Sequence, residues 1–290
     1  MIFLQELARG FQDDPDTKTF LITGATDDDA EVQRTSLREL ARSFKNDSDT
    51  KTFLITPATD NNWNLRFVTV QKLARSFQDD PNTKTFLKTC ITNDNNWNVR
   101  YIAVQELTSN FKDDPDTKNF LKTCATNDNS WNVRYAAVRE LTSKFKGDPD
   151  TKIILITRAI KDDYWKMRRA AVQELARSFK ENPETKTLLI TRAKEDDSAC
   201  LRLRAVRELA RCFHDDDSSV FDVFYNCAVN DPFECKEEDE TNPRRIALEI
   251  IIKQFPQHPQ TLPLLRDKAE NDPDEQVREF AQKKLKQWER

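Results

Sequence analysis

The stretch DNNWNVRY occupies residues 94–101, and close copies of it read DNSWNVRY at 128–135 and DNNWNLRF at 60–67. Each copy places an aspartate, a tryptophan and an arginine at the same spacing. Such a recurrence has two possible origins. Either the three residues form a ligand site that is copied several times, or every copy needs them in order to fold.

The copies belong to a longer repeat, whose period is 33 or 34 residues. A turn phrase keeps the same step, as in DDPDTK at 113–118 and GDPDTK at 147–152. One pair of helices fills a period of this length. A phenylalanine closes each copy: Phe11, Phe44, Phe77, Phe111, Phe145, Phe179 and Phe213.

Each copy contains two stretches with helical character. In the first, 114–126, Asp114 can cap the helix and Pro115 suits its first position. The second, 131–145, places its apolar residues on one side at helical spacing: Val133, Ala137, Val138, Leu141 and Phe145. The chain has only three glycines, and no stretch alternates apolar and polar residues as a strand does. We therefore predict an all-α protein.

Stacked helix pairs form one body without a long-range core, so we predict a single α-solenoid, a superhelical stack, over residues 1–290. Its expected parts are a partial repeat at 1–11, six regular repeats over 12–213, a repeat with an acidic loop insertion at 214–255 and a C-terminal capping repeat at 256–290. A cap is expected because Gln282 and Glu289 replace apolar residues of the second helix there.

The first eleven residues match only the second helix of a repeat. We therefore expect an apolar end to be exposed there, formed by Ile2, Phe3, Leu4 and Leu7. This leads to the hypothesis that the chain is the tail of a longer protein, or that this end docks onto another surface.

Composition limits the classes of function. The net charge of −4 argues against a general affinity for phosphate backbones. No apolar run is long enough to cross a bilayer, and no signal peptide precedes the repeats. The moderate apolar fraction (37%) and the high charged fraction (33%) agree with a thin stack that leaves much of its surface wet.

Within each copy an acid precedes an arginine by six residues. A helical wheel places Arg134 in the middle of the apolar face, where a guanidinium needs a partner. The aspartate of the preceding turn can accept from the arginine of its own or of the neighbouring repeat. We predict an internal arginine ladder of these pairs: Asp60/Arg66, Asp94/Arg100, Asp128/Arg134, Asp162/Arg168, Asp196/Arg202 and Asp272/Arg278. The copy with the insertion retains Arg244, whereas the first full copy has Gln33 in this position.

A turn aspartate followed six residues later by an arginine in the second helix resembles HEAT repeats, over almost the whole chain. Phrases such as AAVQELARSFKENPETKTLL at 170–189 are similar to the C-terminal HEAT arrays of cyanobacterial NACHT-type NTPases. The first resemblance implies an armadillo-type solenoid whose second helices line the concave face. The second implies an interaction or sensing module that regulates an attached NTPase.

Two aromatic columns are candidates for partner binding. One contains Trp63, Trp97, Trp131 and Trp165, at the first turn of the second helix. Its indoles either grip a peptide as a ridge or cover the turn and pack on their neighbours, and we favour packing. The other contains Phe67, Tyr101 and Tyr135, which lie nearer the exposed side on the wheel and suit binding better.

An arginine column on the second helix is a further candidate surface: Arg9, Arg42, Arg75, Arg177 and Arg211. Nucleic acid is the obvious anionic partner for it. Glutamates stand three residues before four of these arginines, as ordinary solvated helix pairs do, so we expect no nucleic-acid binding. Ser109 and Ser143 interrupt the column.

The sequence shows few of the residue patterns that are typical of metal, cofactor or catalytic sites. The six cysteines contain no CxxC pair, the two histidines are isolated and no Gly-rich phosphate loop occurs. The DDPDT acids fit helix capping better than a calcium loop. We therefore expect no metal, no cofactor and no enzyme activity. Cysteines one repeat apart are too distant for disulfides, which suits a reduced, cytoplasmic setting.

The favoured hypothesis is a non-catalytic scaffold or regulatory module, and the C-terminal part of a larger signalling NTPase. Its partner is another protein or an adjoining domain in cis. Two alternatives stay open through other HEAT-like proteins. One is an accessory role as a phycobiliprotein lyase, and the other is a nucleic-acid-binding glycosylase.

Overall fold

The computed structural model describes residues 2–11, 14–44, 47–55, 61–78, 80–213, 218–234 and 241–288. All regular structure in these ranges is helical, and seventeen helices follow one another along the chain. The predicted all-α solenoid is therefore confirmed. The chain divides into two compact units, Met1–Lys146 and Gly147–Arg290, which we describe one at a time.

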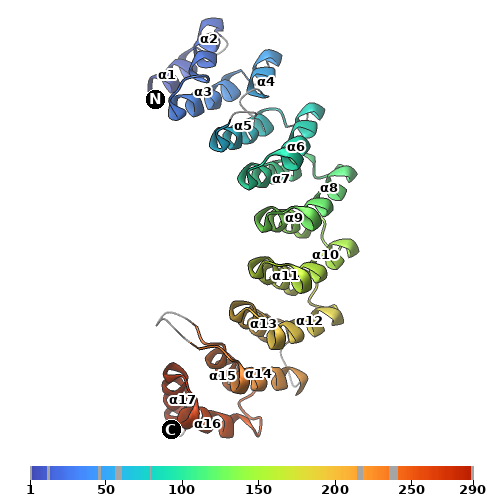
Figure 1. Ribbon diagram of the computed structural model, residues 1–290, viewed down its shortest axis with the longest axis vertical. Helices are drawn as coiled ribbons and strands as arrows, with labels where there is room; N and C mark the ends of the chain where they lie inside the picture. Colours follow the sequence, from blue (N-terminus) through green and yellow to red (C-terminus); the bar gives the residue numbers. More distant parts are fainter. Residues whose placement is uncertain are drawn as a thin grey trace. The chain divides into compact units, whose positions relative to one another are not determined.

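In the first unit, even-numbered helices are the first helices of each pair and odd-numbered helices are the second. The two kinds form two layers (Figure 1). Each second helix packs on the second helix of the next pair, whereas first helices contact mainly the second helices. The helices are α1 (Ile2–Gly10), α2 (Pro15–Gly24), α3 (Ala30–Ser43), α4 (Ser48–Ile55), α5 (Trp63–Ser76), α6 (Pro81–Asn93), α7 (Trp97–Phe111), α8 (Pro115–Asn127) and α9 (Trp131–Lys144).

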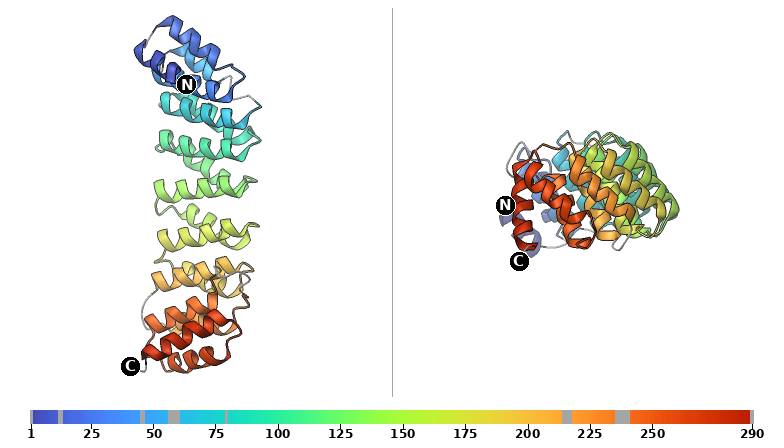
Figure 2. Two further views of the ribbon diagram at one scale, coloured as in Figure 1. Left: turned by 90° about the vertical axis from the view of Figure 1, so that its left-hand side faces the viewer. Right: turned by 90° about the horizontal axis from the view of Figure 1, so that it is seen from below.

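The second unit repeats this arrangement, and its second helices also lie side by side (Figure 2). Here successive first helices touch as well, from α10 to α12 and from α12 to α14. The helices are α10 (Pro149–Lys161), α11 (Trp165–Ser178), α12 (Pro183–Glu195), α13 (Ala199–Cys212), α14 (Ser218–Asn230), α15 (Pro243–Gln254), α16 (Thr261–Asn271) and α17 (Glu275–Trp288).

Local sequence explains where the helices begin. Asp114 caps α8 because its carboxylate accepts from the backbone N–H of Asp116, and Pro115 fills the first helical position without losing a hydrogen bond. Second helices begin at a tryptophan in four pairs, and Asn96 caps α7 in front of Trp97. The first turn of these four second helices therefore places a tryptophan at the end of its pair.

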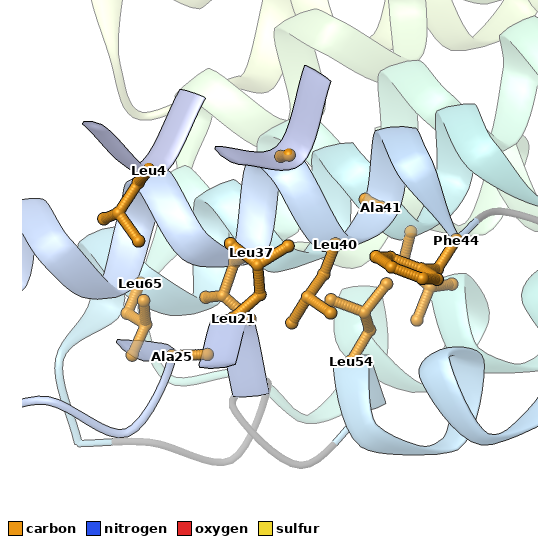
Figure 3. Packing of buried hydrophobic residues seen from close by; sticks show 11 residues of the cluster. Leu4, Leu21, Ala25, Leu37, Leu40, Ala41, Phe44, Leu54 and Leu65 are labelled. Atoms are coloured by element: carbon orange, nitrogen blue, oxygen red, sulfur yellow. The ribbon is translucent and has the colours of Figure 1, made fainter. Parts of the chain in front are cut away.

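Buried leucines hold the layers together. Leu21 of α2, Leu37 and Leu40 of α3 and Leu54 of α4 meet in one cluster of the first unit, in which all four are fully buried (Figure 3). Leu4 of α1 belongs to the same cluster. The expected exposure of this end is therefore wrong for Leu4, because α1 packs on α2 and α3.

Leu7 is half-buried, and the side chains of Ile2 and Phe3 lie outside the described residues. At the other end of the chain, Gln282 is exposed and donates to the carbonyl of Ala269, whereas Glu289 lies outside the described residues.

Candidate functional site

The conserved spacing of aspartate and arginine produces a buried ion pair between neighbouring repeats. Nε and Nη2 of Arg66 donate to both carboxylate oxygens of Asp94, at 2.7 and 2.8 Å. Arg100 holds Asp128 in the same two-pronged way, at 2.9 and 3.0 Å. Each of these two arginines thus binds the carboxylate of the aspartate in the following repeat.

The second unit contains three rungs of the same form. They are Arg168 with Asp196, at 3.0 and 2.9 Å, Arg202 with Asp231, at 2.7 and 2.9 Å, and Arg244 with Asp272, at 3.2 Å. All six side chains are buried. A planar guanidinium that meets a carboxylate with two parallel hydrogen bonds is the strong form of such a pair.

The remaining nitrogen of each arginine ties the rung to its own repeat. Nη1 of Arg168 donates to the backbone carbonyl of Asp162, at 3.0 Å, and Arg134 and Arg278 reach the carbonyls of Asp128 and Asp272 likewise. One arginine therefore fixes the turn of its own repeat to the turn of the next. Such a contact specifies the register of adjacent pairs.

Of the predicted ladder residues one is untested, and the structure adds one that the prediction did not contain. Asp60 lies outside the described residues, so its contacts are not described. Asp231, which the prediction missed, accepts from Arg202, while its backbone carbonyl accepts from Arg244 at 2.7 Å. The insertion separates Asp231 from Arg244 by thirteen residues in place of six. The dipeptide Asn-Asp could have revealed Asp231. In other repeats the first helix ends at the same dipeptide, whose aspartate is Asp94, Asp128 or Asp272.

The pKa of Asp196 shows how the charge is stabilised. Burial alone would raise this pKa, but hydrogen bonds from Arg168 and from the backbone of Ser198 outweigh it and hold the pKa below its ordinary value. The pKa of Arg168 is raised by the same hydrogen bond to Asp196. Both groups therefore stay charged inside the stack, and neither offers a proton for chemistry.

A second ladder connects the first helices, and sequence analysis missed it. Nζ of Lys18 donates to Asp47, the capping aspartate of the next repeat, at 2.6 Å. This hydrogen bond is the main cause that lowers the pKa of Asp47. Further rungs of this lysine ladder are Lys51 with Asp80, Lys84 with Asp114, and Lys152 with Glu184. The DPDTK phrase thus caps one helix and also binds the next repeat.

The tryptophans are less enclosed than a purely packing role requires. Trp63 is 37% exposed and Trp97 is 40% exposed, whereas Trp131 and Trp165 are half-buried. The second aromatic column is half-buried throughout: Phe67, Tyr101 and Tyr135. The expected order of exposure is therefore wrong in the first two copies. A helical wheel treats all turns alike, but the tryptophan begins its helix at the end of the pair, where fewer residues cover it.

The two aromatic columns touch within one helix. The rings of Trp97 and Tyr101 meet edge to face with centroids 6.5 Å apart, and those of Trp131 and Tyr135 lie 6.4 Å apart. These residues are four apart, so they follow one another along the same helical face. Together they form an aromatic edge of the first unit, which we define as Trp63, Phe67, Trp97, Tyr101, Trp131 and Tyr135.

The arginine column pairs with glutamates that are buried beneath it. In the first unit Arg42 lies 2.6 Å from Glu39, and Arg75 reaches forward to Glu106 of the next repeat at 2.8 Å. Burial raises the pKa of Glu106, although Arg75 acts against this shift. The column is thus more than the solvated surface pairing expected from the sequence, because its carboxylates are covered.

The same column in the second unit contains Arg177 and Arg211. Arg177 lies 2.5 Å from Glu174, and Nε of Arg211 lies 2.7 Å from Glu208. Both arginine side chains are 55% exposed, while both glutamates are buried. The hydrogen bond from Arg211 to Glu208 raises the pKa of Arg211. The buried glutamates therefore hold the two guanidinium groups in place, while the arginine side chains stay exposed to solvent.

Comparison with known proteins decides the family. A family model of HEAT repeats matches residues 18–108, 85–176 and 117–210, which together make up more than half of the chain. The chain belongs to the HEAT-repeat family. The X-ray structure of YibA from Escherichia coli is similar over 98% of this chain and 95% of that one, with a TM-score of 0.55. At 18% identity this likeness concerns the fold alone.

No match was found among curated proteins. The narrower resemblance to NACHT-type arrays stays a prediction. None of the helices within the described ranges is both long and apolar enough to cross a membrane.

The cysteines of this HEAT-repeat chain are buried for the most part. Cys90, Cys124 and Cys227 share one position on their first helices, and burial raises the pKa of each thiol to about 12. Cys200 is exposed. Across the described part of the chain, no three acidic, histidine or cysteine side chains gather as a metal site would require.

Proposed function

We propose that this HEAT-repeat chain is a non-catalytic scaffold that binds another protein, or an adjoining domain of its own protein. HEAT repeats in general form scaffolds for protein interaction. The observation that carries the proposal for this chain is the aromatic edge of the first unit. Trp63 and Trp97 expose more than a third of their surface at equivalent places in adjacent repeats.

Exposed tryptophans at a regular step favour a protein ligand. Tryptophan and tyrosine bury a large area with few rotatable bonds, and they are enriched among the residues that dominate binding energy at interfaces. The arginine ladder fixes the turn that precedes Trp97, since Arg66 and Arg100 bind side chains or carbonyls of Asp94 and Asn95. The edge is therefore a preorganised surface.

The ladders argue against a catalytic role for the repeated aspartates. Among the described residues, these carboxylates accept from a buried arginine or from turn amides, as Asp94 does from Arg66 and from the backbone N–H of Asn96. A general acid or base needs a free position for the proton it transfers. These aspartates support the edge and are not proposed to react.

The test uses the variant Trp63→Ala/Trp97→Ala with Trp288→Ala as a matched control, because Trp288 is equally exposed but lies on α17 in the second unit. A photo-crosslinker at Tyr101 identifies the partner, which is then purified for titration calorimetry. We expect the double variant to lose at least about 2 kcal/mol of binding free energy. Equal affinity of the double variant and of the control would contradict the proposal.

The proposal extends to regulation of an attached NTPase, which the NACHT-like phrasing of the sequence supports. The test is the genomic sequence immediately before the codon of Met1. An open frame that encodes a P-loop and further repeats would support regulation in cis. A stop codon there would refute this extension and leave a free-standing scaffold.

A further inference from the structure

The helices α11 and α13 concentrate positive charge in a chain whose net charge is −4. Each of the two helices contains four arginines or lysines and a single glutamate. The helices pack directly against each other within the second unit. One cation of each helix, Arg168 or Arg202, is buried in the arginine ladder, and the other six are half-buried or exposed.

The glutamates do not cancel this charge at the surface. Glu174 and Glu208 are 7% and 4% exposed, and they lie beneath Arg177 and Arg211. Glu208 also contacts Arg204, at 3.4 Å. A ligand approaching from solvent therefore meets the guanidinium groups, while the carboxylates that hold them are hidden.

Two further arginines add charge without any internal partner. Arg207 is exposed and Arg169 is half-buried, and neither forms an ion pair with a described residue. On α13, Arg207 and Arg211 are four residues apart and follow one helical face. On α11, Arg177 is equivalent to Arg211, and Arg169 lies about 80° around the helix from Arg177. We name the set Arg169, Arg177, Arg204, Arg207 and Arg211 the arginine patch.

We infer that the arginine patch binds an acidic segment of a partner polypeptide. The inference rests on the proposed function, for which it names the chemistry of the partner, but it uses a surface other than the aromatic edge. Arginine presents a planar fork that matches a carboxylate, and the buried glutamates preorganise that fork at Arg177 and Arg211. Preorganisation reduces the entropy lost on binding.

The geometry of the repeat suggests a spacing for the acidic residues. Packed helices lie roughly 8–10 Å apart, so equivalent arginines on α11 and α13 are separated by about that distance. A polyproline II segment rises about 3.1 Å per residue with three residues per turn, which brings every third side chain to the same side at about 9 Å. Glutamates three residues apart in such a segment therefore match successive arginines.

A nucleic acid fits the arginine patch less well. Proteins that bind phosphate backbones commonly neutralise about six to ten phosphates, whereas only five arginines are available here and three of them already contact buried glutamates. The net charge of −4 also repels a long polyanion. A short acidic peptide needs only the local patch.

The test measures fluorescence anisotropy of a labelled peptide of repeated Glu-Pro-Pro triplets against the full chain. The same peptide with glutamine in place of glutamate is the ligand control. The variant Arg207→Gln/Arg211→Ser removes two patch cations, and it introduces the residues that Gln173 and Ser143 provide at the equivalent positions of other repeats. Arg266→Gln, an exposed arginine on α16, is the matched charge control.

We expect the acidic peptide to bind and the glutamine peptide not to bind. The double variant should weaken binding at least about tenfold, whereas Arg266→Gln should bind as the parent does. Glu208 keeps its contact with Arg204 in the double variant, and circular dichroism at the binding temperature checks that the variant is folded. Affinity should fall as salt is added.

Three results would overturn the inference. They are no binding of the acidic peptide, equal binding by both arginine variants, and tighter binding of a single-stranded oligonucleotide of equal charge. Any of these leaves the aromatic-edge experiment unaffected, so that the two proposals can fail separately.

Discussion

Removing one carboxylate from the arginine ladder should unfold part of the second unit at unusually low denaturant. In Asp196→Ala, the Arg168 guanidinium loses the hydrogen bonds of 3.0 and 2.9 Å that neutralise it, although the carbonyl of Asp162 still accepts from it. The backbone N–H of Ser198 also loses its acceptor, at 2.9 Å. Breaking a buried ion pair from one side costs about 3–5 kcal/mol.

Asp197 provides the matched control. It also contacts the Arg168 guanidinium, but its side chain is 87% exposed. Exposed ion pairs contribute about 0–1 kcal/mol, so Asp197→Ala should change the free energy of unfolding by no more than that. The two variants remove the same chemical group from adjacent residues, of which only Asp196 is buried and also accepts from the backbone of Ser198.

The assay is urea unfolding followed by far-UV circular dichroism, with hydrogen exchange to locate the loss. We expect exchange to accelerate first in α11, which contains Arg168, and in α12, which Asp196 directly follows, because stability in repeat proteins is local. A second variant, Arg168→Met/Asp196→Asn, removes both charges and should recover much of the lost stability. A cost below about 1 kcal/mol for Asp196→Ala, or no difference from Asp197→Ala, would refute the reasoning.

Because the pKa of Asp196 is lowered in the folded protein, the stability that this carboxylate contributes depends on pH. Because the folded state holds this carboxyl more strongly ionised than the unfolded state does, the stabilisation is complete above the unfolded pKa of about 3.9 and is lost as the pH falls through the folded value. The stability gap between parent and Asp196→Ala should therefore close in acid. A gap that stays constant down to the acid transition would contradict the pKa assignment.

Three further outcomes are expected. Glu106→Gln should raise the free energy of unfolding at neutral pH, because burial raises the pKa of Glu106 and so penalises its charged form. This gain in stability should vanish as the pH falls and Glu106 itself is protonated. A loss of stability at neutral pH would contradict the prediction. Gly147→Ala should cost about 1–2 kcal/mol in thermal unfolding, since Gly147 has a φ of +76° with open space around its missing Cβ; no cost would exclude backbone strain. Peptide mapping after alkylation at pH 8 should find Cys200 modified and Cys124 protected until the chain unfolds, and equal rates would contradict the burial that raises the Cys124 pKa.

The sequence was sufficient for the fold and for the existence of buried arginines. The period, the capping aspartates and the apolar spacing each depend on local chemistry, and they agree with one another. The direction of pairing could not be predicted in the same way. Arg100 is six residues after one aspartate and 28 before another, and both spacings recur, so the choice depends on how neighbouring pairs pack.

Other features were hidden because they depend on the ends of helices. The lysine ladder joins Lys18 to Asp47, and only the stacking of successive repeats brings the two together. The exposure of Trp97 follows from its place at the beginning of α7, which a helical wheel does not represent. Asp231 was missed because an insertion changed its spacing from Arg244, while its place after α14 was unchanged.

Each ladder arginine binds groups of two successive turns, and this affects how the number of repeats in the gene can change. Arg100 binds both the backbone of its own turn and the carboxylate of the next, so its guanidinium has all of these partners only where two repeats follow one another. Duplication of a whole period in frame supplies both sets of partners at once, and its excision removes both. A chain built in this way can gain or lose length in whole steps without leaving an orphaned cation behind.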